Sequence, residues 1–314
     1  MYDTTKPYNE DIKALVKETW DTPYISIKDN VIRKKLPYRI FYDEYSHTDG
    51  VGSKGIYHWQ QRSFRNAVLD ALAMNLNDLL LMRAVPYAIN NHLFLPRDDE
   101  AAIIEIISCL SEECKKYYIA IAGGETAIHN DMGGLEISIT MLGLVKKFKV
   151  NRFKDGDILL GIESNGLHSN GFTKVREVFK DEYKDDFIKE TAIYFNTVNA
   201  LDKLISIHGM CHITGGAFTK LRDYSEDVDF VIGNEHRLNP HGTFLELHER
   251  GVPDEEMYKT FNCGIGFVLG VNEKDVDRCL ENIKDFKADV IGKIVKGSNR
   301  VKIKSKFSRK EILY

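Results

Sequence analysis

The segment TDGVGSK, at residues 48–54, combines residue types that suit a metal-bound phosphate group. Asp49 offers a hard carboxylate oxygen to Mg²⁺, and Lys54 offers a positive charge to phosphoryl oxygens. Glycines let the backbone and its N–H groups approach a ligand closely. Taken alone, however, the Asp-Gly pair favours a plain turn, and the spacing is not that of a Walker A loop. The phosphate contacts that this segment would supply are Gly50, Gly52, Ser53 and Lys54.

Polar residues also interrupt an apolar stretch, residues 66–82, which has no Gly or Pro and is predicted to form a buried helix. Asp70 and Asn77 are seven residues apart and therefore return to nearly the same helical face. Asp78 could equally be a metal ligand or a hydrogen-bonded group at the helix end. Glu125, in the sequence GGET, directly follows a predicted strand and places another carboxylate at a tight turn. These separated acids could converge on one cation, and the metal candidates are Asp49, Asp70, Asp78 and Glu125.

Two glycine-punctuated loops in the second half of the chain are suited to receive phosphate oxygens. The first reads SNGLHSNG at residues 164–171 and is predicted between a strand and a helix, where free N–H groups can bind an anion. The second reads HITGG at residues 212–216 and repeats that arrangement. Either loop could instead cap a helix, and either histidine could be a satisfied structural donor. The polar and glycine residues concerned are His168, Ser169, Asn170, His212, Thr214, Gly215 and Gly216.

The elements that must position these residues follow an α/β pattern of the α+β type. In the first half, strands are predicted at residues 38–45, 86–95, 118–122 and 137–141, and helices at residues 66–82 and from residue 98. A polar, irregular stretch follows at residues 146–157, so we expect two domains, at residues 1–148 and 149–314. In the second, strands are predicted at residues 158–162, 260–271 and 290–295, and helices at residues 172–179, 195–207 and 273–283.

The composition excludes several classes of protein. The 314 residues include 43 Lys and Arg against 47 Asp and Glu, and a net charge of −4 gives no field to attract a polyanion, so no nucleic-acid partner is expected. No stretch approaches the about 18 apolar residues that a membrane span needs, and the charged N-terminus lacks the core of a signal peptide, so no membrane association is expected. The five cysteines form no C-x-x-C pair, which fits a reducing cytoplasm.

Six motifs occur in order between residues 48 and 266: TDGVGSK, LAMNLND, GGETA, SNGLHSNG, GMCHITGG and EMYKTFNCGIG. Together they resemble aminoimidazole ribonucleotide synthetase, also called phosphoribosylformylglycinamidine cyclo-ligase. The last motif is especially characteristic of this enzyme among its ATP-binding relatives, which include formylglycinamidine ribonucleotide synthetase, thiamine-monophosphate kinase and selenophosphate synthetase. The chain is thus identified as a divergent member of the family.

This resemblance implies a two-domain cytoplasmic subunit whose N-terminal sheet pairs with that of a second subunit in a homodimer, with ATP near the dimer interface. The C-terminal domain would be a mixed sheet with helices that binds substrate and phosphate. The implied reaction converts formylglycinamidine ribonucleotide and ATP to aminoimidazole ribonucleotide, ADP and phosphate, with Mg²⁺ as the metal, in purine synthesis.

Carried over residue by residue, the resemblance implies that Asp49, Asp78 and Glu125 hold Mg²⁺ and that Lys54 neutralises phosphate charge. Lys13 lies in a short match to an early helix in which a lysine is near the nucleotide. Other candidates are His168 or His212 as proton carrier; Gly50, Gly52, Ser53, Lys54, Asn77, Gly123, Gly124 and Thr126 for ATP; and Ser169, Asn170, Thr214, Gly215 and Gly216 for substrate.

Two departures from the family pattern keep other functions open. The family's glycine-rich loop before the first strand is missing, and Ala192 replaces an arginine that could contact an anion. The alternatives are an ATP-dependent phosphoryl-transfer enzyme of the same superfamily with another substrate, or a catalytically weak, dimerising homologue.

Overall fold

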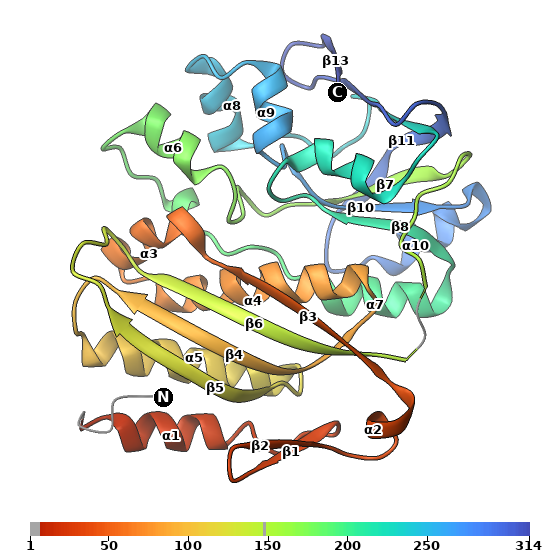
Figure 1. Cartoon of the computed structure of the whole chain (residues 1–314). Coiled ribbons are helices and arrows are strands. Elements are labelled where there is room, and N and C mark those ends of the chain that lie inside the picture. The colour runs from red at the N-terminus through yellow and green to blue at the C-terminus, as the bar shows by residue number, and fades with distance from the viewer. Residues whose placement is uncertain (1–6, 147–148) are drawn as a thin grey trace. The chain divides into compact units, whose positions relative to one another are not determined.

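A computed structural model describes residues 7–146 and 149–314 of the chain (Figure 1). The chain divides into two compact units, Met1–Lys149 and Val150–Tyr314, which we call the N-terminal and C-terminal units and describe separately. Each unit builds a β-sheet with helices packed against it, so the fold is α+β, as the sequence predicts.

The N-terminal unit contains a four-stranded sheet in the order β3–β6–β4–β5. Strand β6 is antiparallel to both of its neighbours, whereas β4 and β5 are parallel, so β3, β4 and β5 all end at the same end of the sheet. The strands are β3 (Asp43–Gly50), β4 (Val85–Leu95), β5 (Ala120–Ile128) and β6 (Glu136–Val145).

Two sequence predictions about these strands are wrong in part. The strand predicted at residues 38–45 begins later, because Pro37 is followed by the short helix α2 (Tyr38–Phe41). The Asp-Gly pair and the GGET sequence were expected in turns, but both lie in strands: Asp49 pairs with Ile139 of β6, and Gly124 pairs with Asn91 of β4. Cross-strand hydrogen bonding therefore overrides the turn preference of glycine at both places.

Helices cover one face of this sheet (Figure 1). Helix α4 packs against β3 and β6 and is buried nearly all round, as its apolar sequence predicts. Helix α5 packs beside it, begins at Asp99, whose carboxylate caps the Ala102 N–H at 3.0 Å, and contacts α1 on its other side. The helices are α1 (Asn9–Lys17), α3 (Gly55–Gln61), α4 (Phe64–Leu81) and α5 (Glu100–Lys116), with the 3₁₀ helix η1 (Gly52–Lys54) before α3.

A hairpin of β1 (Ile25–Lys28) and β2 (Val31–Lys34) packs on the sheet at one place. Its Ile25 and Ile27 form a buried cluster with Ala88, Ala120 and Leu144. The hairpin lies in the segment where the family's glycine-rich loop was expected, so a two-stranded element stands there instead.

The C-terminal unit contains a seven-stranded mixed sheet in the order β13–β12–β9–β11–β7–β10–β8. All neighbours are antiparallel except β12 and β9. The strands are β7 (Ile158–Glu163), β8 (Ile207–His212), β9 (Val228–Ile232), β10 (Ile265–Val271), β11 (Ala288–Lys296), β12 (Val301–Lys304) and β13 (Glu311–Leu313).

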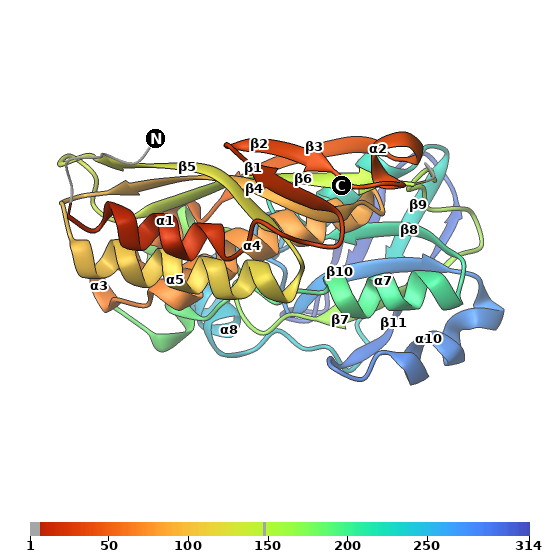
Figure 2. The same cartoon turned by 90° about the horizontal axis from the view of Figure 1, so that it is seen from below.

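The helices of the C-terminal unit include the one predicted after the first glycine loop, labelled α6 in Figure 1, and the one predicted at residues 195–207, labelled α7 in Figure 2. They are α6 (Phe172–Phe179), α7 (Phe195–Leu204), α8 (Gly242–Glu249), α9 (Asp254–Thr260) and α10 (Val276–Asn282), with 3₁₀ helices η2 (Asp185–Ile188), η3 (Ala217–Tyr224) and η4 (Glu273–Asp275). None of the helices in the described parts of the chain is long and apolar enough to cross a membrane.

Candidate functional site

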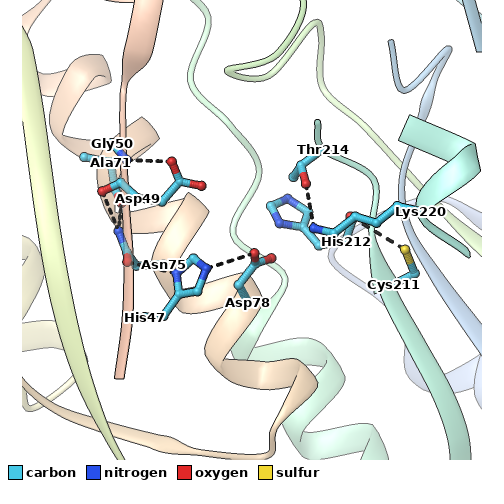
Figure 3. A network of polar contacts seen from close by, with 10 residues as sticks. All are labelled: His47, Asp49, Gly50, Ala71, Asn75, Asp78, Cys211, His212, Thr214 and Lys220. Atoms are coloured by element: carbon cyan, nitrogen blue, oxygen red, sulfur yellow. Dashed lines mark hydrogen bonds and ion pairs between the residues drawn. The ribbon is translucent and has the colours of Figure 1, made fainter. Parts of the chain in front are cut away.

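Four polar residues of the N-terminal unit form a connected network, which we call the His47 cluster (Figure 3): His47, Asp49, Asn75 and Asp78. The Asn75 amide nitrogen donates to the backbone oxygens of Ala71, at 2.9 Å, and Asp49, at 3.1 Å. This orientation leaves the Asn75 side-chain oxygen facing His47 Nδ1 at 3.1 Å. On the other side of the ring, His47 Nε2 lies 3.3 Å from Asp78 Oδ2.

The periods of a strand and a helix bring these residues together. His47 and Asp49 are two residues apart on β3 and therefore point to the same face of the sheet. Asn75 and Asp78 are three residues apart on α4 and therefore share a helical face. Because α4 packs on β3, the two faces meet. The sequence interpretation missed His47 and Asn75, although the spacing of His47 from Asp49 was a usable signal.

The His47 cluster favours positive charge. The hydrogen bond to Asp78 raises the pKa of His47, burial opposes the rise, and the negative charges of Asp78 and Asp49 add to it. Both ring nitrogens face acceptor oxygens, an arrangement that only the doubly protonated ring satisfies by donating from each side. Two carboxylates that stabilise a cationic ring also have the oxygen donors and the charge that a Mg²⁺ ion requires.

Glu125 is not part of the His47 cluster. Register places Asp49 in one row with Ile139, Asn91 and Gly124, whereas Glu125 pairs with His92 in the next row. Because successive residues of a strand point to opposite faces, Asp49 faces the helices and Glu125 faces away from them. The two residues lie on the two edge strands, about 14 Å apart by the usual strand spacing.

The expected convergence of four acids on one cation is therefore not found within one chain. Among the described residues, no group of three or more His, Cys, Asp or Glu side chains is arranged to hold a metal ion. A metal bound by Asp49 or Asp78 would need further oxygens from a ligand, from water or from a second chain.

Asp70 and Lys54 form a separate buried group. Lys54 Nζ and His58 Nε2 each lie 2.7 Å from Asp70 Oδ2, and the three side chains are fully buried. Burial raises the pKa of Asp70, but the charge of Lys54 and the bond from His58 outweigh burial and lower the pKa to about 2. Asp70 thus pairs with a buried ammonium group, and the Lys54 side chain points into the interior. A metal role for Asp70 and a phosphate role for Lys54 stay predictions.

Glu136, which the sequence interpretation missed, binds the glycine segment from the first residue of β6. Its carboxylate accepts a hydrogen bond from the Gly52 N–H, whereas the Val51 N–H donates to the Ile137 backbone oxygen at 3.2 Å. A Cβ added at Gly50 would overlap a Glu136 oxygen, which is why glycine is required there. Burial raises the pKa of Glu136, the two N–H groups lower it, and the charge of Asp49 raises it further. The Gly52 N–H, which was expected to contact phosphate, thus already donates to an internal carboxylate.

The remaining N-terminal candidates are dispersed. Asn77 is fully buried on α4, and Gly123, Gly124 and Thr126 lie within β5. The Thr126 hydroxyl and both amide atoms of Asn91 are buried without a hydrogen-bond partner in the described parts of the chain. Ser53 lies in η1, and Lys13 is exposed on α1 with its ammonium 2.8 Å from Glu10.

The two glycine loops of the C-terminal unit lie next to each other. A Cβ added at Gly215 would be 3.9 Å from Asn170 Oδ1, and Ser169 Oγ is 3.0 Å from Thr191 Oγ1. Lys220, which the sequence interpretation missed, donates from Nζ to Thr214 Oγ1 at 2.9 Å (Figure 3). Loops separated by more than 40 residues are brought together because β10 pairs with both β7 and β8, the strands that precede them.

The histidines of these loops lie inside an aromatic cluster. His168 and His212 are almost fully buried, with ring centroids 6.5 Å apart, and the Tyr194 ring is 6.2 Å from that of His168. A Cβ at Gly266 would overlap both Tyr194 and His168, so the GIG sequence is needed for close packing. Ala192, at the position of the family arginine, is buried.

Comparison with known proteins identifies the family. Residues 42–145 match the model for AIR synthase related protein, N-terminal domain, and residues 154–304 match the model for the C-terminal domain. Phosphoribosylformylglycinamidine cyclo-ligase of Saccharolobus solfataricus is 38% identical over 236 residues, covering 73% of this chain and 71% of the relative. The enzyme of the same name from Methanocaldococcus jannaschii is 37% identical over 271 residues, covering 79% of this chain and 77% of the relative.

Solved structures with the same fold are more distant in sequence. HypE of E. coli superposes with a TM-score of 0.71 at 15% identity, covering 97% of this chain and 96% of that chain. Thiamine-monophosphate kinase of Stenotrophomonas maltophilia superposes with a TM-score of 0.67 at 16% identity, covering 97% and 98%. A HypE in complex with ATP has a TM-score of 0.70 at 14% identity, covering 98% and 94%. At these identities the structures establish the fold, while the sequence relatives and both domain models establish that this chain belongs to the phosphoribosylformylglycinamidine cyclo-ligase family, a family of ligases.

Proposed function

We propose that this chain uses ATP to close the imidazole ring of formylglycinamidine ribonucleotide, giving aminoimidazole ribonucleotide, ADP and phosphate. The observation that carries the proposal is the His47 cluster, in which Asp49 and Asp78 concentrate negative charge, in a chain whose curated relatives are named for this reaction. The two glycine loops of the C-terminal unit supply donors for a phosphorylated substrate.

The chemistry requires activation of an amide oxygen, which leaves poorly. Transfer of the γ-phosphoryl group of ATP to the formyl oxygen makes an iminophosphate and releases ADP. A nitrogen of the amidine side then attacks the former formyl carbon, the carbon–oxygen bond breaks, phosphate leaves, and the nitrogen loses a proton. Binding contacts at both ends of the substrate would hold the attacking nitrogen close to the activated carbon. The ring closure is then faster, because the two reacting atoms are already in the required orientation.

ATP and Mg²⁺ are the proposed cofactors, supported by the ATP complex of the structural neighbour HypE. Asp49 and Asp78 would hold the metal, which neutralises charge on the transferring phosphoryl group when bound. His47 would keep Asp78 oriented in the absence of metal, since its ring lies 3.3 Å from that carboxylate. His168 or His212 remains the proposed proton carrier of the C-terminal unit.

A homodimer is also part of the proposal. Asp49 and Glu125 lie on the two edge strands of the N-terminal sheet, β3 and β5, and exposed edges favour pairing with a second copy. Pairing β3 of one subunit with β5 of another would continue the sheet across the two subunits and place the strands that carry Asp49 and the partner's Glu125 side by side. The five cysteines are all free and buried, which suits the cytoplasm that we propose as the compartment.

A direct assay tests the reaction. Purified protein with Mg-ATP and formylglycinamidine ribonucleotide should form aminoimidazole ribonucleotide with one ADP per product, and chelation of the metal should stop it. ADP release without ring closure on this substrate, but with another phosphorylated substrate, would instead support a different phosphoryl-transfer enzyme, an alternative for which Ala192 at the arginine position is the supporting observation. Absence of both ATP binding and ADP release would support a catalytically weak homologue.

A further inference from the structure

The C-terminal unit presents an unusual concentration of hydrogen-bond donors where its two glycine loops meet. The N–H groups of Thr214, Gly215 and Gly216 donate to no acceptor in the described part of the chain. Gly216 has φ of 80° and Ala217 has φ of 42°, so the backbone turns at this point, and turns of this kind can form concave sites for anions from successive N–H groups. Gly215 and Gly216 are exposed, so these donors are accessible.

Lys220 adds a positive charge to these donors. It lies on η3, the 3₁₀ helix that begins directly after the loop, and its side chain folds back to place Nζ 2.9 Å from the hydroxyl of Thr214. Thr214 is buried, and the Lys220 side chain is half-buried, so the ammonium is held at the loop rather than extended into solvent.

The neighbouring loop contributes a further donor. The amide nitrogen of Asn170 is buried and has no hydrogen-bond partner in the described part of the chain, and Asn170 Oδ1 lies 3.9 Å from where a Gly215 Cβ would be. A buried amide donor without an acceptor costs free energy, which a ligand that accepts from it would recover. Donors from two adjacent loops, together with an ammonium group, match the several acceptor oxygens of a phosphate monoester.

We infer that Lys220 binds the 5′-phosphate of the ribonucleotide substrate, together with the N–H groups of Gly215 and Gly216 and the amide of Asn170. This inference rests on the proposed function for the identity of the substrate, although the phosphate contact itself does not depend on the reaction. It also explains how a chain with Ala192 in place of an arginine supplies a cation for the substrate. Lys220 is a specificity-determining residue in this role, because it selects the phosphorylated over the unphosphorylated ribonucleoside.

Calorimetry on the full chain tests the phosphate contact apart from chemistry, with ribose 5-phosphate and ribose as probes. The wild type should bind ribose 5-phosphate, and Lys220→Met should weaken that binding at least about tenfold. Lys220→Arg should retain most of the affinity. The control Lys203→Met, which removes an exposed lysine of the same unit, should leave the affinity unchanged. Equal binding by Lys220→Met and wild type would overturn the inference, as would a wild type that binds no ribose 5-phosphate.

A second measurement distinguishes the substrate phosphate from the γ-phosphate of ATP, the other phosphate source. A non-hydrolysable ATP analogue should bind the wild type and Lys220→Met equally, and in turnover the variant should raise KM for the ribonucleotide while KM for ATP is unchanged. Loss of the ATP analogue rather than of ribose 5-phosphate would overturn the assignment. If the protein binds ribose 5-phosphate through Lys220 but forms no aminoimidazole ribonucleotide, the proposed reaction fails while the phosphate site stands.

Discussion

Asp49 and Glu125 lie on opposite faces of the N-terminal sheet and on its two edge strands, β3 and β5. Both are acids that the sequence motifs associate with one metal, yet three strand spacings separate them within a chain. If both act in one site, the site takes one acid from each of two subunits. A site shared between subunits can be tested with dimers that combine two different variants, whereas assays of single variants cannot detect the sharing.

Asp49→Asn and Glu125→Gln should each be inactive alone and should regain activity when mixed under conditions that exchange subunits. In random mixing, half the dimers are mixed, and one of the two sites in each mixed dimer has both wild-type acids, so about one quarter of wild-type activity is expected. The activity of the mixture, measured before and after subunit exchange, checks this. No recovery despite proven exchange would mean that the two acids do not act together across subunits.

Asp78→Asn should weaken the response to Mg²⁺ without unfolding the protein. The variant removes one of the two charges of the His47 cluster but keeps the shape of the side chain, so the Mg²⁺ concentration for half-maximal ATP binding should rise at least about tenfold. Calorimetric titration of Mg-ATP measures this. The matched control is Asp131→Asn, which removes an exposed acid of the same unit and should change nothing. An unchanged Mg²⁺ response in Asp78→Asn would remove Asp78 from the site.

Asp70→Asn should be one of the most destabilising single changes in the N-terminal unit. It leaves the ammonium of Lys54 buried without its countercharge, which costs about 3–5 kcal/mol of unfolding free energy. Urea unfolding of the variant and of wild type at neutral pH measures the difference. A loss below about 1 kcal/mol would contradict the proposed dependence of Lys54 on this partner.

The Lys54–Asp70 pair should also make the free energy of unfolding depend on pH. The pKa of Asp70 is about 2 in the folded chain against an ordinary value of 3.8, so its ionised form stabilises the fold. That contribution is complete above about pH 4 and is lost as the pH falls through 2. The stability difference between wild type and Asp70→Asn should therefore be constant at neutral pH and narrow between pH 4 and 2, in unfolding curves measured across that range. A difference that stays constant down to pH 2 would assign the stabilisation to something other than the charge.

Glu136→Gln tests whether the glycine segment binds phosphate. The carboxylate of Glu136 accepts from the Gly52 N–H and places a negative charge beside the N–H groups of the glycine segment, where a phosphate would approach. The amide keeps an acceptor oxygen but removes the charge, so Mg-ATP should bind more tightly if these N–H groups contact its phosphates. Unchanged ATP affinity would indicate that Glu136 only holds the segment in shape.

The free energy of unfolding of Glu136 variants tests the structural role of the same carboxylate. Glu136→Ala removes the carboxylate that accepts from the Gly52 N–H and should lower the free energy of unfolding by about 1–3 kcal/mol. Because burial raises the pKa of Glu136, the ionised side chain is less favourable in the folded chain than in the unfolded one. The stability of wild type relative to Glu136→Gln should therefore fall as the pH rises through the raised pKa, above the ordinary 4.5. A relative stability that does not change with pH would contradict the burial of an ionised carboxylate at this position.

The sequence by itself determined the family, the α+β class and the main helices. The apolar run of α4 has no residue that interrupts a helix. Each of the six motifs is a short continuous segment, so it can be recognised in the sequence without knowing where it lies in the fold. Secondary-structure propensity and motif chemistry depend on residues that are neighbours in the sequence, so both can be predicted from the sequence alone.

Only the tertiary structure decided which side chains meet. The register of β3 with β6 sets the face of the sheet to which the Asp49 side chain points, and the packing of α4 brings Asp70 to Lys54. Neither can be predicted from the residues next to Asp49 or Lys54 in the sequence. Lys220 reaches Thr214 because η3 turns back on its loop, and Asn170 joins them because β10 pairs with two strands that are far apart in sequence. Charges are neutralised by neighbours in space, and strand pairing sets those neighbours.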